Sequence, residues 1–402
     1  MGIILIFILT VGCLYSDDYY FNNKTYLTVD KGFGSINTPK ETKKKTSLSK
    51  IVLRNNFLAI KDDNKFAATI NYTSVVGMGF NNKYKTRIGG FDILNIENLY
   101  YTKCFKYGIS ATIGIINFRT NNFNTSNIYN SINGIGIYGL VDFELEGLLL
   151  SYRTETAMFT AGFISKDKYF NTAHILNTNN NVARSKKIFS IFNGSDGHTL
   201  LIKHKPTSRL TLDYNFYHYN ELLYGLGEKE IKLIALSIIY DRTTTIGDKL
   251  YSVISLSNTD GDSSSLKQIY PNEIVSNSYF GEYDVDGYNI MLGYSKHVDE
   301  LMPKHSVKLG IEIEYVSENY NNLSIGMPIS VNSNGAIGYT VRGYSTVTIK
   351  RDMLIRIMYD RYLNGTGKTT QVLGVPIATI IDEKSTCYKN SSLFSMGFIY
   401  KF

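Results

Sequence analysis

Short segments in which apolar and polar residues alternate recur along most of the chain from residue 66 onward. The clearest is HSVKLGIEIEYV at 305–316, where Val307, Ile311 and Tyr315 share one face and Lys308 and Glu312 share the other. A period of two is that of a β-strand, whose successive side chains point to opposite faces. The alternation alone fits a soluble sandwich with an apolar core and a membrane barrel with an apolar exterior.

The alternating segments predict an all-β chain of about 16 to 18 strands. The predicted strands are 66–80, 86–92, 109–118, 136–143, 147–153, 157–164, 186–192, 198–204, 209–219, 231–240, 249–257, 287–296, 305–316, 337–349, 353–363 and 392–402. If the last strand runs toward the periplasm, the longer connections 220–230, 258–286, 317–336 and 364–391 are extracellular loops, and the shorter ones are periplasmic turns. The long connection 165–185 breaks this rule and indicates a missed strand near 169–176.

Seven segments end in the same way, with two apolar residues at alternate positions and a tyrosine two positions further on. They are Leu148-Leu150-Tyr152, Leu210-Leu212-Tyr214, Leu236-Ile238-Tyr240, Ile290-Leu292-Tyr294, Ile311-Ile313-Tyr315, Ile355-Ile357-Tyr359 and Met396-Phe398-Tyr400. A tyrosine is stable where hydrocarbon meets headgroups, because its ring is apolar and its hydroxyl is not. The repeated ending favours a membrane barrel with aromatic girdles over ordinary tyrosine enrichment in strands.

The first sixteen residues have the form of a secretory signal, with an apolar run from Ile3 to Val11 followed by small residues and an acidic pair. Cleavage near Ser16 and lipidation of Cys13, which follows Gly12, both remain open. No later stretch has 18 uninterrupted apolar residues, so a closed barrel is the remaining way to span a bilayer. We expect a signal peptide at 1–16, a polar periplasmic lead-in or first strand at 17–65, and a transmembrane β-barrel at 66–402.

The end of the chain gives the strongest signal for a membrane barrel. Five apolar residues occupy alternate positions there, namely Phe394, Met396, Phe398, Tyr400 and Phe402. This resembles the C-terminal signature of outer-membrane proteins, which the barrel assembly machinery reads. With ATIGIINFRT, ELEGLLLSYR and KLGIEIEY, it makes residues 100–402 similar to the porin superfamily, and more loosely to a porin-like family of unknown function. The resemblance implies an antiparallel transmembrane barrel in a Gram-negative outer membrane.

Composition and charge exclude several other classes of protein. The formal charge of +7 is spread along the chain, and its one dense basic run, Lys40 to Lys45, is explained better by a solvated linker than by a nucleic-acid site. Three cysteines, Cys13, Cys104 and Cys387, form no C-x-x-C pair and indicate no metal site. Cys104 and Cys387 fit either a disulfide or two unpaired thiols, with unpaired thiols as the default.

The search for catalytic chemistry finds no motif. The six histidines occupy no recognisable nucleophile or metal motif, and His218 fits an interfacial position at a strand end. GLG at 225–227 and NGTGK at 364–368 lack the spacing of a phosphate-binding loop. We therefore expect no enzymatic activity, no catalytic residue, no cofactor and no metal.

Charged residues on the polar phase are the better functional candidates, because a water-filled lumen is where a barrel can place them. The candidate pore-lining residues are Asp142, Glu144, Arg153, Lys308, Glu312, Glu314, Arg342, Arg356 and Asp360. They predict a porin for passive diffusion of ions or small hydrophilic solutes; the alternative is a structural or adhesive barrel that binds a surface ligand through its long loops. Expected partners are outer-membrane lipid, the barrel assembly machinery and small hydrophilic solutes, with no nucleic acid, and a homotrimer is one assembly that the resemblance allows.

Overall fold

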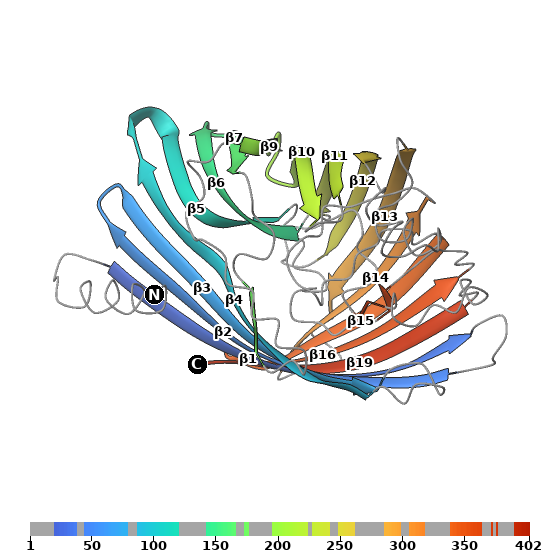
Figure 1. Cartoon of the computed structure of the whole chain (residues 1–402). Helices are drawn as coiled ribbons and strands as arrows, with labels where there is room; N and C mark the ends of the chain where they lie inside the picture. The colour runs from blue at the N-terminus through green and yellow to red at the C-terminus, as the bar shows by residue number, and fades with distance from the viewer. Residues whose placement is uncertain are drawn as a thin grey trace.

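Sixteen strands join edge to edge into one closed antiparallel barrel (Figure 1). The computed structural model describes residues 20–37, 44–78, 87–119, 142–165, 173–176, 195–223, 227–241, 248–261, 285–298, 305–317, 338–363, 371–372, 375–376 and 390–402. The ring runs in chain order from β1 to β7, continues from β9 to β16, and ends with β19. The fold therefore confirms the predicted all-β barrel.

The strands of the ring alternate in direction around the barrel. Their bounds are β1 Tyr20–Asn37, β2 Lys44–Lys61, β3 Asn64–Met78, β4 Arg87–Cys104, β5 Ile109–Arg119, β6 Asp142–Arg153, β7 Ala157–Ser165, β9 Ser195–His204, β10 Leu210–Leu223, β11 Gly227–Asp241, β12 Lys249–Gly261, β13 Val285–His297, β14 Ser306–Val316, β15 Gly338–Lys350, β16 Met353–Leu363 and β19 Asn390–Lys401.

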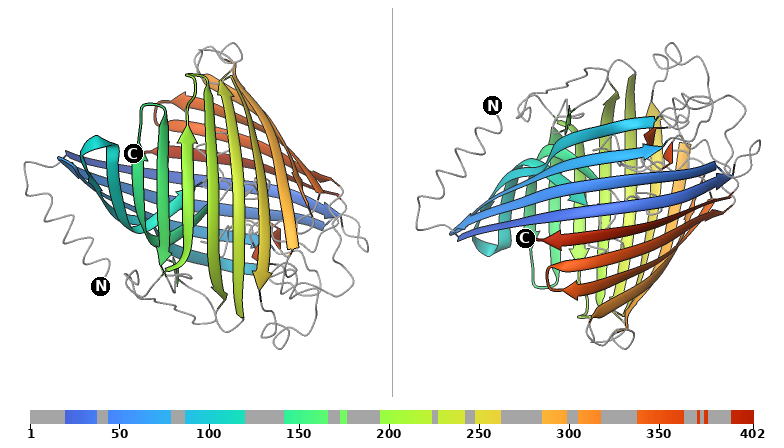
Figure 2. Two further views of the ribbon diagram at one scale, coloured as in Figure 1. Left: turned by 90° about the horizontal axis from the view of Figure 1, so that it is seen from above. Right: turned by 90° about the horizontal axis from the view of Figure 1, so that it is seen from below.

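The barrel closes where β19 lies between β16 and β1 (Figure 2). Tyr400 stands opposite Met353 of β16, and Lys401 stands opposite Tyr26 of β1. Two backbone bonds extend the pairing to the last residues: the Lys401 N–H donates to Asp352 O at 2.8 Å, and the Phe402 N–H donates to Thr25 O at 2.9 Å. The closing strand β19 is thus hydrogen-bonded to its neighbours up to the end of the chain.

The N-terminal region corrects one expectation. Residues 17–65 were expected to form a lead-in or at most a first strand, but β1 and β2 are two full strands of the ring. Their inward positions include Thr28 and Asp30, which are buried, while Val29 and Phe33 point outward and are exposed. Polar residues such as Lys31 occur on the outward phase of these strands as well, so the alternation is weak in the sequence. Polar residues on the inward phase are compatible with the interior of a barrel.

The connections at the two ends of the barrel differ in length. The turns after β2, β6 and β15 are short, at 62–63, 154–156 and 351–352, and β1 begins and β19 ends beside them. The connections after β5, β12, β14 and β16 lie at the other end and are long. The predicted long connections 258–286, 317–336 and 364–391 match this asymmetry, but the predicted connection 220–230 is wrong, because β10 and β11 extend into it and leave only 224–226. We name the two ends the short-turn end and the long-loop end.

Between residues 86 and 194, the predicted strands 109–118, 147–153 and 157–164 lie within β5, β6 and β7, but two other predicted segments differ from the structure. The segment 86–92 is the start of the longer β4, the last residues of 136–143 belong to β6, and 186–192 lies outside the described residues. The connection that follows β7 therefore starts at the long-loop end, which removes the break in alternation. Within the predicted extra strand near 169–176, only the short β8, Ala173–Leu176, is described, and it pairs with Asp92–Asn95 of β4.

A close backbone approach marks the point where β5 leaves β4. Pairing between the two strands ends at Leu99 opposite Ile115, and the preceding Gly114 has φ 135°. A Cβ at Gly114 would lie 2.3 Å from the Leu99 carbonyl oxygen, so only glycine fits there. Beyond this point β8 takes the edge of β4 that β5 vacates.

A second, very small sheet lies within the ring. Its strands are β17, Gln371–Val372, and β18, Val375–Pro376, which pair with each other and with no strand of the barrel among the described residues. Both Figure 1 and Figure 2 show this hairpin inside the ring, on the side of β13 to β15. Part of the long connection between β16 and β19 is thus placed in the interior.

Candidate functional site: the inner wall of the barrel

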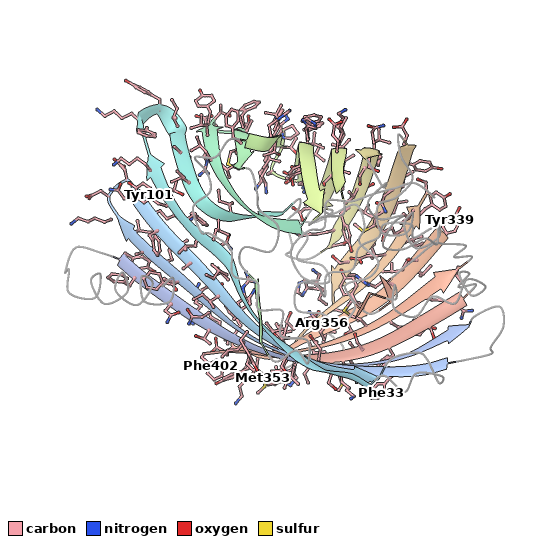
Figure 3. All side chains as sticks on the ribbon, viewed as in Figure 1. Phe33, Tyr101, Tyr339, Met353, Arg356 and Phe402 are labelled. Carbon is pink, nitrogen blue, oxygen red and sulfur yellow. The ribbon has the colours of Figure 1, made fainter. Side chains whose placement is uncertain are left out.

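The outer face of the barrel is apolar. On β13 the alternation is complete, with Tyr288, Ile290 and Leu292 exposed and Asn289 and Met291 buried. Leu292 has 58% of its surface exposed, and many other large apolar side chains on this face are exposed as well. Exposure of so many apolar side chains to water would be unfavourable. Figure 3 shows the same outward direction for Phe33, Tyr101, Tyr339, Met353 and Phe402.

Charged residues bound this apolar face at both ends of β13. The outward positions from Tyr288 to Tyr294 are apolar or aromatic, and the next outward positions are Asp286 and Lys296, which are both exposed. The ten residue steps from 286 to 296 rise about 34 Å along a strand, or about 25 Å across a bilayer at the usual tilt, which is the height of the apolar band of a membrane barrel. The exterior therefore has the dimensions of a membrane-spanning surface.

The seven tyrosine endings occur on strands of both directions. Four belong to strands that run toward the short-turn end, with tyrosines Tyr152, Tyr240, Tyr294 and Tyr400, and three belong to strands that run the other way, with tyrosines Tyr214, Tyr315 and Tyr359. Tyr315 forms an outer row with Tyr288 and Tyr339, at ring-centroid distances of 5.7 and 4.8 Å. Because the pattern occurs on strands of both directions, it shows that each tyrosine points outward but does not give its height along the barrel.

The assembly-signal residues lie on the outer face of β19. Phe394, Met396 and Phe402 are exposed, and Phe398 and Tyr400 are partly exposed. The Tyr400 and Phe402 rings pack edge to face at a centroid distance of 4.8 Å. The geometry places this apolar row on the outer face of the barrel, and its contact with lipid and its recognition by the barrel assembly machinery stay predictions.

The inward face carries the charged residues. Glu312 on β14 lies opposite Arg342 on β15, and an Arg342 Nη1 to Glu312 Oε2 distance of 3.6 Å makes them an ion pair. Glu314, two positions further along β14, accepts a 2.6 Å hydrogen bond from the Asn289 side-chain amide. The polar phase predicted for these residues is therefore the interior phase.

A tyrosine reaches the same carboxylate from two strands away. Tyr251 on β12 stands opposite Gly293 on β13, and Gly293 stands opposite Glu312 on β14. The Tyr251 hydroxyl donates to Glu312 Oε1 at 2.8 Å and lies 3.4 Å from the hydroxyl of Tyr344. A Cβ at Gly293 would lie 2.1 Å from the Tyr251 ring, so the glycine opens the path across its strand.

The second interior ion pair crosses the closing strand. Arg356 on β16 stands opposite Gly397 on β19, which in turn stands opposite Asp30 on β1. Arg356 Nη2 donates to Asp30 Oδ1 at 3.0 Å, and Figure 3 shows Arg356 directed into the barrel. Asp30 was not among the predicted residues, because the region 17–65 was expected to be a polar periplasmic lead-in or first strand and the partner of Asp30 lies 326 positions away.

The other predicted pore-lining residues have different positions. Lys308 lies on the inward phase of β14 and is partly buried, whereas Arg153 is exposed at the short-turn end of β6. Asp360 pairs through its backbone with Arg342, and Asp142 and Glu144 pair with Arg119 and Asn117. The side chains of Asp142, Glu144 and Asp360 lie outside the described residues.

The inner wall differs from the expected one in its contact with water. Glu312, Glu314 and Arg342 each have 1% of their surface exposed, and Arg356 has 3%. Neighbouring inward side chains on β11 to β13, such as Leu233, are fully buried as well. A charge removed from water needs partners, and the ion pairs and hydrogen bonds above provide them. These residues thus form a paired network rather than a freely hydrated lining.

The described residues contain no membrane-spanning helix and no cluster of metal ligands. No helix among them has the length and apolar character needed to cross a membrane. No group of three or more histidine, cysteine, aspartate or glutamate side chains in these ranges is placed to hold a metal ion. Cys104 is exposed at the end of β4.

A closed antiparallel barrel with an apolar outer band and a charged interior has the architecture of a transmembrane β-barrel. No family model and no curated protein matches the sequence. Among solved structures, OmpF of Salmonella typhi in complex with daunomycin aligns at 9% identity over 96% of this chain and 99% of its own, with a TM-score of 0.51.

Two other solved outer-membrane proteins align over most of the chain. The channel DcaP of Acinetobacter baumannii has 10% identity, a TM-score of 0.49 and coverage of 96% of this chain and 99% of its own. OprB of Pseudomonas putida has 13% identity, a TM-score of 0.49 and coverage of 98% and 96%. At 9% sequence identity, what the chain shares with OmpF is the fold.

Proposed function

We propose that the protein is an outer-membrane porin through which ions or small hydrophilic solutes diffuse passively. The observation that supports this proposal most directly is the closed ring of sixteen strands with charged residues on its inner face. At this number of strands a barrel is wide enough to hold water. No covalent step is part of the proposal, and the solutes, the lipid and the assembly machinery enter as partners by inference from the sequence, as does a homotrimer.

The interior charges would set the selectivity of the pore. Glu312 and Glu314 on β14 and Asp30 on β1 are acidic, and Arg342 and Arg356 between them are basic. Fixed charges on the wall of a pore can select among ions. The pairing of these residues fixes the positions of the charges, and the partly buried Lys308 adds a basic group near the short-turn end.

A structural or adhesive barrel with a filled lumen is the second candidate, and one observation favours it. Many inward side chains from β11 to β15, such as Met291 and Arg342, are almost completely buried, and the β17–β18 hairpin lies inside the ring. A sheet one layer thick buries its inner face only where something covers it. If the cover extends across the whole lumen, no solute passes and the long connections carry the function.

Single-channel recording in a planar lipid bilayer separates the two candidates. The full chain, refolded in detergent and shown to be folded by heat-modifiable electrophoretic mobility, is added to one side. Steady, ohmic current steps support the porin. Absence of current from the folded sample contradicts the porin and supports the filled barrel.

A further inference from the structure

Two histidines face each other on the outer surface, near the long-loop end. His198 on β9 stands directly opposite His218 on β10, with ring centroids 4.7 Å apart and planes inclined at 72°. Both lie on the outward phase, because their neighbours Thr199 and Tyr217 are the buried, inward residues. Neither ring belongs to the inner wall, so the proposed transport function does not use them.

The pair lies just past the edge of the apolar band. The outward residues of its register row are all polar, and they are His198, His218, Lys232, Asn258 and Asp286. The next outward row toward the short-turn end is apolar, and it consists of Leu200, Phe216, Ile234, Leu256 and Tyr288. His198 is exposed and His218 has 23% of its side chain exposed, so an ion in water can reach both rings.

A carboxylate fixes the orientation of one ring. Glu230 Oε1 on β11 lies 2.5 Å from His218 Nε2, and Lys232 Nζ lies 3.2 Å from the same oxygen. An ionised carboxylate only accepts hydrogen bonds, so Nε2 carries the hydrogen that His218 donates to Glu230. In the neutral ring the lone pair is then on Nδ1. A carboxylate behind a histidine is the arrangement that orients metal-binding imidazoles in proteins.

We propose that His198 and His218 bind a divalent transition-metal ion of the zinc class, with Glu230 as a positioning residue behind His218. Two imidazoles on one tetrahedral zinc, with Zn–N bonds of about 2.0–2.1 Å, have ring centres about 5 Å apart, close to the observed 4.7 Å. Water completes the coordination, because Glu230 contacts the ring and not the ion. The arrangement has two protein ligands, in keeping with the absence of a larger ligand cluster among the described residues.

Titration with Zn²⁺ tests the site in the folded, full-length chain in detergent micelles, with isothermal calorimetry as the readout. We expect one ion per chain, and a loss of affinity of at least tenfold in His198→Ala and in His218→Ala. Glu230→Gln should weaken binding by about 10- to 100-fold, and Glu230→Asp should recover part of it. Mg²⁺, which prefers oxygen ligands, should not bind there.

Two control variants distinguish binding at this site from non-specific binding of zinc elsewhere on the protein. His297→Ala removes an imidazole near the short-turn end, and Asn258→Ala removes a polar side chain from the same outer row, so both should bind as the parent does. If His218→Ala fails to fold, His218→Gln keeps a polar side chain of similar length and removes the imidazole. Unchanged zinc affinity in the histidine variants would overturn the site, and unchanged affinity in Glu230→Gln would overturn the positioning role.

Discussion

Arg356 and Asp30 form an ion pair across an intervening strand. Arg356 Nη2 on β16 and Asp30 Oδ1 on β1 are 3.0 Å apart, and the strand between them, β19, presents Gly397 to the guanidinium. The pair therefore links the two strands that flank β19. Both groups are almost fully buried, so the loss of either would leave the other charge in a buried position without this partner.

The glycine under this pair should be intolerant of a methyl group. A Cβ at Gly397 would lie 2.0 Å from Asp30 Oδ1 and 3.2 Å from Arg356 Nη2, so Gly397→Ala should displace the carboxylate and weaken the pair. Gly343→Ala is the matched control, because a Cβ at Gly343 meets nothing within 4 Å. Urea midpoints in lipid vesicles should fall for Gly397→Ala only. Equal midpoints for the two variants would show that the pair adjusts freely.

Reversing one charge of the pair should cost more than reversing both. Arg356→Glu places a second carboxylate beside Asp30, and loss of a buried partner typically costs about 3 to 5 kcal/mol. The double variant Asp30→Arg, Arg356→Glu restores opposite charges and should recover a large part of the loss. The free energies of unfolding of the four proteins form a double-mutant cycle. Additive effects would contradict a direct interaction.

The terminal residue should matter more than an ordinary outward aromatic. Deletion of Phe402 removes the backbone bond to Thr25 and the ring contact with Tyr400, so we expect an exported chain that assembles poorly in the outer membrane. Phe33→Ala, which removes another exposed aromatic from the outer face, should assemble normally. Surface levels and heat-modifiable mobility measure the effect. Normal values for the deletion would show that assembly does not depend on Phe402.

The proposed lumen charge can be tested at a residue that is not fully buried. Lys308→Glu changes a partly buried, inward basic group to an acidic one and should shift the reversal potential under a salt gradient toward cations. Lys296→Glu makes the same change of charge at an exposed outward position on β13 and should leave the reversal potential unchanged. Equal reversal potentials for both variants would remove Lys308 from the conducting path.

A charged residue on the outer face should lower the free energy of unfolding more at the middle of the apolar band than at its edge. Leu292→Arg puts a guanidinium within the apolar stretch of β13, where the cost near mid-depth is about 2 to 4 kcal/mol. Asp286→Arg puts the same group at the charged edge of the band, where the cost is about 0 to 1 kcal/mol. Unfolding in vesicles gives both values. A neutral Leu292→Arg would mean that this face of the barrel does not contact lipid.

Strand phase is the part of the fold that a sequence of this kind reveals best. Ile311 and Ile313 point outward and Glu312 and Glu314 inward, as their alternation predicted. Phase depends only on neighbouring residues in one strand, so no knowledge of pairing is needed. The region from Tyr20 to Lys61 was harder, because its outward phase mixes apolar residues such as Val29 with polar ones such as Lys31, which weakens the alternation.

The partners of the interior charges could not be predicted. Glu312 meets Arg342 from the adjacent strand and Tyr251 from two strands away, and the second contact exists only because Gly293 stands between them. Such a contact depends on the register of three strands, which the single sequence does not contain. For the same reason the sequence predicted hydrated charges where the structure has a buried, paired network.

The pairing of β19 with β1 also has a consequence for the order of folding. The two partners of this seam are separated by almost the whole chain, so the loop that must close before they meet is the longest in the molecule. Until then β1 presents an open edge, and so does β16 as long as β19 has not paired with it; open strand edges pair readily with other chains. A stalled or truncated chain should therefore aggregate through these two edges, and a peptide with the sequence of β19 should be an effective inhibitor of that aggregation.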